Sequence, residues 1–443
     1  MTQRLRNWRL LGAAALIFGA VIAWRLLFLP SALAFAGGHQ VDLSLYQGAP
    51  VTGVPTELAN ADRVTKGKYL AEATDCAACH TAKGGKPFAG GRPFKLPFGT
   101  IYTPNITPDR ETGIGAWSNA EFLRAVHKGI GRAGERLYPA FPYASYTLLS
   151  DADVLAIRGY LGTIPAVRQA NIPNSFGFPF NQRWLMAIWG TFFNPNARFR
   201  PVAERSARWN RGAYLVEAAG HCGECHTPRT LMQAMDTRRK FAGGQAEGWN
   251  AYNITSDRLS GIGTWSPEAL AAYLAKGHAP GHGVASGPMA EAVELSTSRM
   301  TPTDIAAMVA YLRTVPPLSS KASPPMAGPA PVVASAGPSD NPGGKRLFEG
   351  ACASCHAWSG RGAVKPDQQL TGNRAVNDAS AANVALMILN GIGSPEHDGA
   401  FMPSFRAAYS DEEIASVANY VTARFGAKPS RVSAADVRKM REE

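Results

Sequence analysis

Apolar residues recur at every third or fourth position in three short stretches along the chain. This spacing predicts helices that each bury one face in a core. Their N-termini carry local signals: Pro302 lies in the first turn of one, and Ser410 with Glu413 forms a capping box on another. Strict alternation is scarce, so strands find little support and an all-α fold is expected. The three stretches are SDADVLAIRGYL (Ser150–Leu161), TPTDIAAMVAYL (Thr301–Leu312) and SDEEIASVANYV (Ser410–Val421).

The N-terminus carries an apolar run from Leu10 to Leu29, broken only by Trp24 and Arg25. A helix of about 20 residues spans about 30 Å, the hydrocarbon core of a bilayer. Arginines precede the run, which places that side in the cytoplasm and the rest of the chain outside it. Residues 1–36 are therefore predicted to be either a signal anchor or a signal peptide, because AFA before Gly37 resembles a cleavage site.

Two long segments of the chain repeat. KGKYLAEATDCAACH (66–80) is echoed by RGAYLVEAAGHCGECH (211–226), and NITPDRETGIGAW (105–117) by NITSDRLSGIGTW (253–265). A third and more divergent copy opens with GKRLFEGACASCH (344–356) after a stretch rich in Pro, Ala and Ser. Repeats of this kind indicate copies of one domain. The predicted domains are residues 61–170, 205–316 and 343–426, with an extended linker over 317–342.

All six cysteines lie in Cys-x-x-Cys-His motifs, one in each repeat. The two sulfurs suit thioether bonds to haem, and the adjacent histidine can bind the iron. A structural zinc site would bring two such pairs close together, and a thioredoxin-like pair would lie beside a strand-helix-strand unit, which the pattern lacks. The sequence therefore predicts three covalently bound haem c groups. The residues are Cys76, Cys79 and His80; Cys222, Cys225 and His226; Cys352, Cys355 and His356.

A methionine is the expected second axial ligand, and it raises the reduction potential relative to a second histidine. Met289 in GPMAEAV and Met402 in AFMPSF precede the final helices of the second and third repeats and are the candidates there. Met300 competes with Met289. A buried core thioether is the commoner role for a methionine, and it is the one expected of Met308.

The first repeat has no methionine between Cys76 and Leu185, and Phe141 in YPAFPY stands where Met402 would align, allowing one gap. Three alternatives remain open. Met186, otherwise expected in a core, can fold back from the segment between the first two repeats; the iron can be open or water-bound; or His127 can bind it, although a solvated or capping role suits His127 better.

These motifs, together with YTPNITPD, YPAFPY, FPFNQRWLMAIW and GPMAEAV, resemble the trihaem cytochrome c subunits of membrane-bound periplasmic dehydrogenases that act on alcohols, aldehydes, gluconate or sorbitol. The resemblance implies three class I-like cytochrome c domains in tandem, preceded by an N-terminal hydrophobic helix. It also implies a bacterial inner-membrane location on the periplasmic side. Electrons would pass from a catalytic subunit of the pyrroloquinoline quinone, flavin or molybdenum type to ubiquinone in the membrane. Many members of the family carry methionine in the slot of Phe141, giving YPAMPY, and a version with phenylalanine also occurs, so the ligation of the first haem departs from the commoner pattern.

The formal charge of +12 favours an acidic partner protein or a membrane surface, since no basic aromatic stripe suggests nucleic acid. The chain shows no nucleotide fingerprint and no catalytic triad, so we expect an electron carrier rather than an enzyme. Two alternatives are a dihaem-peroxidase-like enzyme that uses an open first haem, and a haem c subunit of a terminal oxidase.

Overall fold

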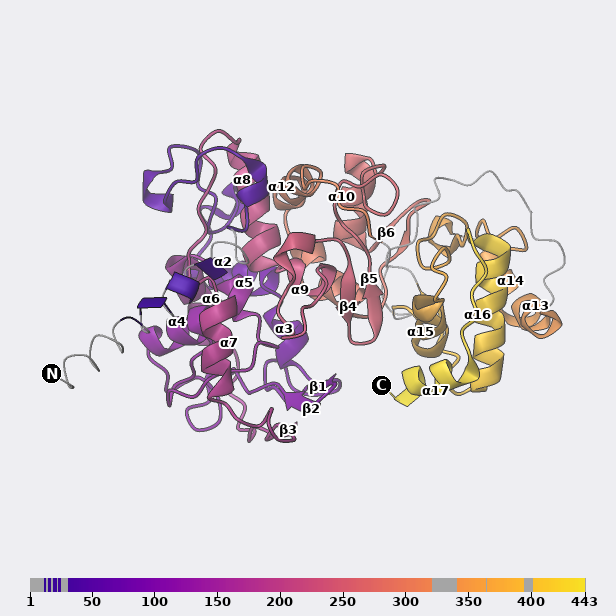
Figure 1. Cartoon of the computed structure of the whole chain (residues 1–443), viewed down its shortest axis with the longest axis horizontal. Helices are drawn as coiled ribbons and strands as arrows, with labels where there is room; N and C mark the ends of the chain where they lie inside the picture. Colours follow the sequence, from indigo (N-terminus) through magenta and orange to yellow (C-terminus); the bar gives the residue numbers. More distant parts are fainter. Residues whose placement is uncertain are drawn as a thin grey trace.

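The computed structural model describes residues 31–320, 341–363, 365–393 and 401–442, with a few positions between 12 and 24. The third domain lies at one end of the molecule beside the second, and the first two pack together (Figure 1). Most of the predicted N-terminal hydrophobic helix and most of the predicted linker fall outside the described residues. Within the described part of the chain, no helix has both the length and the apolar character needed to cross a bilayer.

The first repeat follows three short 3-10 turns that lie between residues 34 and 58. Its elements are α2 (Arg63–Ala73), α3 (Cys76–His80), β1 (Pro93–Leu96), β2 (Gly99–Tyr102), α4 (Asn119–Lys128), α5 (Tyr143–Tyr146) and α6 (Asp151–Leu161). The segment that joins it to the second repeat contains β3 (Ser175–Phe176) and α7 (Leu185–Phe193).

The second repeat contains α8 (Ala207–Tyr214), the π-helical turn η4 (Leu215–Ala219), α9 (Gly223–His226), η5 (Thr237–Arg239), β4 (Gly244–Ala246), β5 (Trp249–Ala251), α10 (Pro267–Lys276), β6 (His278–Ala279), β7 (Gly283–Val284), α11 (Pro288–Leu295), η6 (Thr297–Arg299) and α12 (Pro302–Leu312). The third contains α13 (Pro342–Leu347), the π-helical turn η7 (Phe348–Cys352), α14 (Ala353–His356), η8 (Pro366–Gln368), α15 (Ala382–Asn390), α16 (Asp411–Phe425) and α17 (Ala434–Glu442).

The all-α expectation is wrong in part, because helices are joined by short antiparallel strands. One sheet has the order β1-β2-β3, and β4-β5 and β6-β7 form two further pairs. Each strand is only two to four residues long, which is too short to leave an alternating pattern in the sequence. The helices still carry most of the core, and the strands within the described residues lie in the first two domains and the segment between them.

The three predicted final helices are present as α6, α12 and α16. Each begins after a side-chain cap, and the capping box of Ser410 with Glu413 and the first-turn position of Pro302 are confirmed. In every domain the final helix packs across the helix that precedes the cysteine motif. A glycine allows the close crossing, because a Cβ there would collide with a backbone carbonyl of the final helix. The pairs are Gly67 with Ala156, Gly212 with Ala307 and Gly344 with Ser416.

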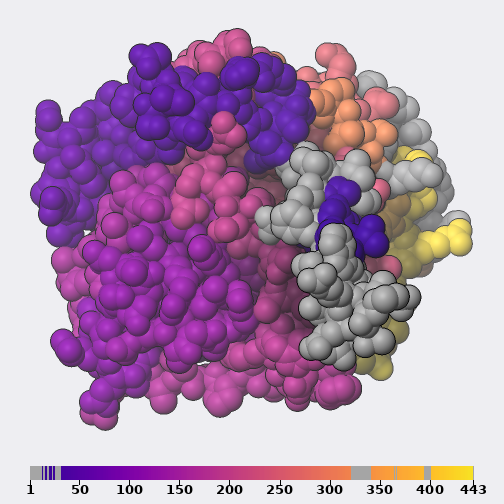
Figure 2. Space-filling model, turned by 60° about the vertical axis from the view of Figure 1, so that its left-hand side comes forward, coloured from indigo at the N-terminus to yellow at the C-terminus, as the bar shows by residue number. Residues whose placement is uncertain are grey.

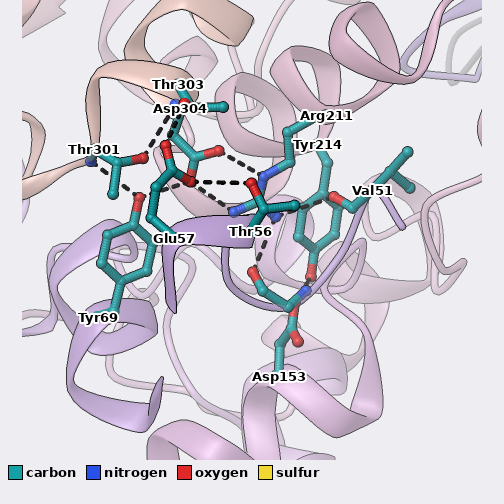
Figure 3. A network of polar contacts seen from close by, with 11 residues as sticks. Val51, Thr56, Glu57, Tyr69, Asp153, Arg211, Tyr214, Thr301, Thr303 and Asp304 are labelled. Carbon is teal, nitrogen blue, oxygen red and sulfur yellow. Dashed lines mark hydrogen bonds and ion pairs between the residues drawn. The ribbon is translucent and has the colours of Figure 1, made fainter. Parts of the chain in front are cut away.

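The first two domains pack through a pair of exchanged hydrogen bonds (Figure 3). Tyr69 of the first domain donates to Asp304 of the second over 2.6 Å, and Tyr214 of the second donates to Asp153 of the first over 2.5 Å. Tyr69 and Tyr214 occupy the same repeat position, and so do the two aspartates. Duplication of one domain has therefore produced an interface with approximate two-fold symmetry, as in a symmetric dimer.

Arg211 adds a buried ion pair to this interface. Its guanidinium binds Asp304 with a shortest N–O distance of 2.7 Å, and the two side chains are 8% and 1% exposed. The same guanidinium donates to the carbonyls of Val51 and Gly53. The third domain has Arg346 and Glu413 at the positions of the tyrosine and the aspartate, so it cannot form the same contact.

Replacing Arg211 with methionine is expected to destabilise the first two domains by about 3–5 kcal/mol, because a buried carboxylate would lose the cation that pairs with it. Urea unfolding followed by circular dichroism measures this change. Arg168→Gln is the matched control: its pair with Glu111 is 72% and 63% exposed, so its loss should cost less than about 1 kcal/mol. Equal effects of the two substitutions would contradict the buried role of Arg211.

The N-terminal segment packs against the second domain. Leu33 and Val51 are buried in the core shared by the first two domains, and the Phe35 ring centroid lies 6.0 Å from that of Tyr311. The backbone carbonyl of Ala36 accepts a hydrogen bond from Arg205. Figure 2 shows this indigo part of the chain lying over the magenta and pink parts. Residues on both sides of the possible cleavage site are thus part of the fold.

Candidate haem centres

The first two cysteine motifs form short helices of their own, whereas the third ends a continuous helical run from Pro342 to His356. The motif helices are α3, α9 and α14, and the chain changes direction just before the first two of them, where Asp75 and His221 have φ values of 53° and 38°. The second motif follows a π-helical turn, and Cys352 of the third motif is the last residue of another. In the first two domains the motif helix is therefore a separate element from the entering helix.

Each motif histidine makes the same kind of hydrogen bond, from its Nδ1 to a backbone carbonyl. His80 Nδ1 lies 2.8 Å from the Pro104 carbonyl oxygen, His226 Nδ1 lies 2.6 Å from that of Tyr252, and His356 Nδ1 lies 2.6 Å from that of Gln368. A carbonyl only accepts, so Nδ1 carries the proton and the lone pair is on Nε2. Burial lowers the pKa of all three imidazoles, which keeps them neutral. This is the state that binds iron.

The thiols fit covalent attachment better than thiol redox chemistry. Burial raises the pKa of Cys76 and Cys352 to about 11 and that of Cys222 to about 12. A redox-active thiol needs a lowered pKa so that the thiolate is populated at neutral pH. The cysteines and histidines of each motif therefore fit a c-type haem, with two sulfurs for the thioether bonds and Nε2 for the iron.

The loops that carry the candidate methionines can be aligned by register. In the first domain Ile130 pairs with Arg136, and Leu137 N–H donates to the Gly129 carbonyl. In the second domain His278 pairs with Val284, and Ala285 N–H donates to the Gly277 carbonyl. Counting onward by the same number of residues from each pair aligns Phe141 with Met289, and this alignment needs no gap.

Met289 and Met402 lie at the cores of their own domains. Met289 is the second residue of α11 and packs, half-buried, against the core of the first two domains. Met402 pairs with Ile392 and packs against the same third-domain core as Cys352. Met300 and Met308 are buried within the hydrophobic core, 8% and 0% exposed, which is the role expected of Met308 and makes Met300 a weaker competitor.

The alternative ligands for the first haem lie in different surroundings. Met186 is half-buried on α7, one turn before Trp189, whose ring contacts that of Tyr143 in the first domain. His127 is not solvated, contrary to expectation, since it is only 1% exposed. Its Nδ1 lies 3.1 Å from the Tyr146 carbonyl oxygen, and its Nε2 lies 3.2 Å from an Asp151 carboxylate oxygen.

The first and second motifs are joined through Tyr146. Its hydroxyl donates to the carbonyl of Thr74, two residues before Cys76, over 2.6 Å. Its ring stacks on His221, the residue before Cys222, with centroids 5.2 Å apart. The neighbouring Ser145 donates to Glu224, inside the second motif, over 2.7 Å. One short segment thus contacts both sites.

Arg92 makes a second connection between these sites. It donates to the carbonyl of Ala78, inside the first motif, and forms an ion pair with Glu291 on α11 of the second domain. Glu291 and Met289 are two residues apart on one helix, which places their side chains roughly 200° apart around its axis. Glu291 therefore faces the first motif while Met289 faces the second domain.

The second site also borders the third domain. Tyr252, whose carbonyl binds His226, donates its hydroxyl to Asp378 of the third domain over 3.1 Å. Asn250 on β5 exchanges backbone hydrogen bonds with the Asn383 side chain. The sequence patterns did not reveal Arg92, Tyr146 or these interdomain contacts, because none of them recurs with a motif spacing.

These domains define a cytochrome c. The cytochrome c family matches the chain over residues 64–165, 210–316 and 343–424, and the chain belongs to that family. It is an electron-transfer protein with c-type haem domains, and the resemblance drawn from its motifs is confirmed.

Among curated relatives, one of the subunits of nicotinate dehydrogenase from Pseudomonas putida is 40% identical over 97% of the chain, but the match covers only 35% of that longer protein. The gluconate 2-dehydrogenase cytochrome c subunit of Pantoea cypripedii is 36% identical over 87% of the chain and 91% of its own length. The fructose dehydrogenase cytochrome subunit of Gluconobacter japonicus is 35% identical, over 90% and 87%.

Proposed function

We propose that this protein carries three haem c groups and passes electrons from the catalytic subunit of a periplasmic dehydrogenase to ubiquinone in the bacterial inner membrane. The observation that carries the proposal is the shared arrangement of His80, His226 and His356, in which Nδ1 binds a backbone carbonyl and the lone pair is left on Nε2. Contacts between successive sites support a relay through all three domains.

The haem irons would supply one-electron chemistry, and the chain would hold one haem in each of its three successive domains. The six motif cysteines would anchor the porphyrins, and the three histidines would bind the irons. Met289 and Met402 would be further iron ligands in the second and third domains, with Met186 as the weaker candidate in the first. A relay with this chemistry needs a separate catalytic subunit to oxidise the substrate.

The relatives support a dehydrogenase partner, since those named above belong to gluconate, fructose and nicotinate dehydrogenases. The catalytic subunit would be of the pyrroloquinoline quinone, flavin or molybdenum type. Purification of the native membrane complex with identification of its large subunit, followed by a ubiquinone reduction assay with the oxidised substrate, tests the proposal. Co-purification of a copper or haem b oxidase would overturn it.

A second candidate function follows from Phe141, which takes the position of Met289 in the first domain. An iron without a sixth ligand can bind a small molecule, so the protein could act as a peroxidase. Binding of CO or cyanide to the first haem together with turnover of hydrogen peroxide would support this function. Ligand binding without turnover would leave the electron relay as the activity.

We also propose that residues 1–36 are an uncleaved signal anchor. Cleavage after Ala36 would remove Leu33, which is 2% exposed, and Phe35, which packs on Tyr311. It would also remove the Ala32 carbonyl that accepts from Lys240. The intact mass of the protein purified from membranes should therefore include these residues, and an N-terminus at Gly37 would contradict the anchor.

A further inference from the structure

Arg374 of the third domain inserts into the second domain. The side chain belongs to the segment between η8 and α15, and the residue is 6% exposed. Its guanidinium donates to the carbonyl of Asn253 over 3.0 Å and to the carbonyl of Ser260. It also lies over the Tyr252 ring, 5.1 Å from the centroid. All three residues belong to the loop that holds the second motif histidine.

This cation has no ion-pair partner within the described part of the chain. It has only carbonyl acceptors, an aromatic face and a buried Nε with no hydrogen-bond partner there. Burial lowers its pKa to about 10, which still leaves the guanidinium charged at neutral pH. Burying a charge without a paired anion costs free energy, so a role for the charge is expected.

The charge lies close to the second motif. Tyr252, beneath the guanidinium, is the residue whose carbonyl fixes His226, and Asn253 follows directly. A positive charge in a buried environment interacts strongly with a neighbouring redox centre. Reduction of iron adds an electron, so a nearby cation favours the reduced state and raises the potential.

The first domain provides an internal comparison. Thr112 occupies the repeat position of Ser260, and Asn105 that of Asn253. There the side chain of Asn171 donates to the Thr112 carbonyl over 3.2 Å, which corresponds to the contact of Arg374 with Ser260, and it also accepts from the Asn105 N–H over 2.7 Å. A neutral, exposed amide from the segment that follows the first domain thus contacts the carbonyl whose counterpart in the second domain receives a buried cation from the third.

We propose that Arg374 raises the reduction potential of the haem at the second motif, so that this potential depends on docking of the third domain. The proposal rests on the proposed function, because it requires a haem at Cys222, Cys225 and His226. Arg374 acts as a positioning and charge-supplying residue through the loop of Tyr252 and Asn253. With this cation the second haem would have a higher reduction potential, and so accept electrons more readily, than with a neutral amide such as Asn171 at the same position.

Spectroelectrochemical titration of the full chain, purified from a host competent in cytochrome maturation, tests this inference. Arg374→Gln should lower one of the three potentials by about 59 mV, which is a tenfold change for a one-electron couple, and leave the others in place. Met289→Leu should alter the same potential and so assign it to the second haem. The matched control is Arg438→Gln, an exposed arginine of the third domain that pairs with Asp411.

Two further variants separate charge from packing. Arg374→Lys should lower the potential much less than Arg374→Gln does, because the cation remains. Asp378→Asn, which removes an anion bound to Tyr252, should raise it. Unchanged potentials in Arg374→Gln, or equal falls in the Lys and Gln variants, would overturn the proposal. Haem content and ubiquinone reduction are measured on the same samples, so fewer than three haems in the wild type would count against the proposed function instead.

Discussion

Replacing Cys222 and Cys225 with alanine is expected to leave two covalent haems in each chain instead of three and to abolish electron transfer to ubiquinone. Without the two sulfurs, haem has no thioether bonds at the second motif. The second domain contacts the first through Tyr146 and Glu224 and the third through Asp378 and Arg374. Loss of the middle centre should therefore interrupt the relay rather than only slow it.

Haem content measured as the pyridine haemochrome, alongside the quinone reduction assay, checks this expectation. Ser354→Ala is a matched control, because it changes an exposed residue between the cysteines of the third motif and keeps both sulfurs. Three haems per chain in the double alanine variant would show that these cysteines are not an attachment site. Two haems with normal quinone reduction would place the second centre outside the electron path.

The sequence could predict those features whose signals lie within a few consecutive residues. The caps of α12 and α16 lie beside the residues they serve, and the cysteine motifs are contiguous, so both were found by pattern. The strands β6 and β7 are two residues long, too short to show alternation of apolar and polar residues, so only their pairing in the structure identifies them. They matter for the site, because their register aligns Phe141 with Met289.

The interdomain contacts could not be predicted from the sequence for a different reason, which is the long separation of the contacting residues along the chain. Tyr69 and Asp304 lie 235 residues apart, and Arg374 and Asn253 lie 121 apart. The repeat reveals that Tyr69 and Tyr214 are equivalent, but only packing shows that each reaches the aspartate of the other domain. The third copy lacks this tyrosine and aspartate, and that domain contacts the second through Arg374 and Asn383.

Replacing Phe141 with methionine is expected to raise the reduction potential of the first haem. The register places residue 141 where Met289 stands in the second domain, and a methionine opposite histidine raises the potential of a haem. Phe141 packs half-buried beside Tyr146, with ring centroids 5.6 Å apart. Tyr146 in turn binds the segment that leads to Cys76, so the substituted thioether would lie near the first site. Redox titration of the full chain measures the shift.

Binding of CO to the reduced protein separates the alternatives for this haem. If the iron is open, the wild type should bind CO at one haem, Phe141→Met should lose that binding, and the control Phe141→Leu should keep it because leucine offers no donor atom. If Met186 already binds the iron, the wild type should not bind CO and Phe141→Met should shift no potential. Met186→Leu would then gain CO binding, since it alone would vacate the sixth position. The two patterns are opposite, so one set of spectra decides whether the first centre can take an exogenous ligand.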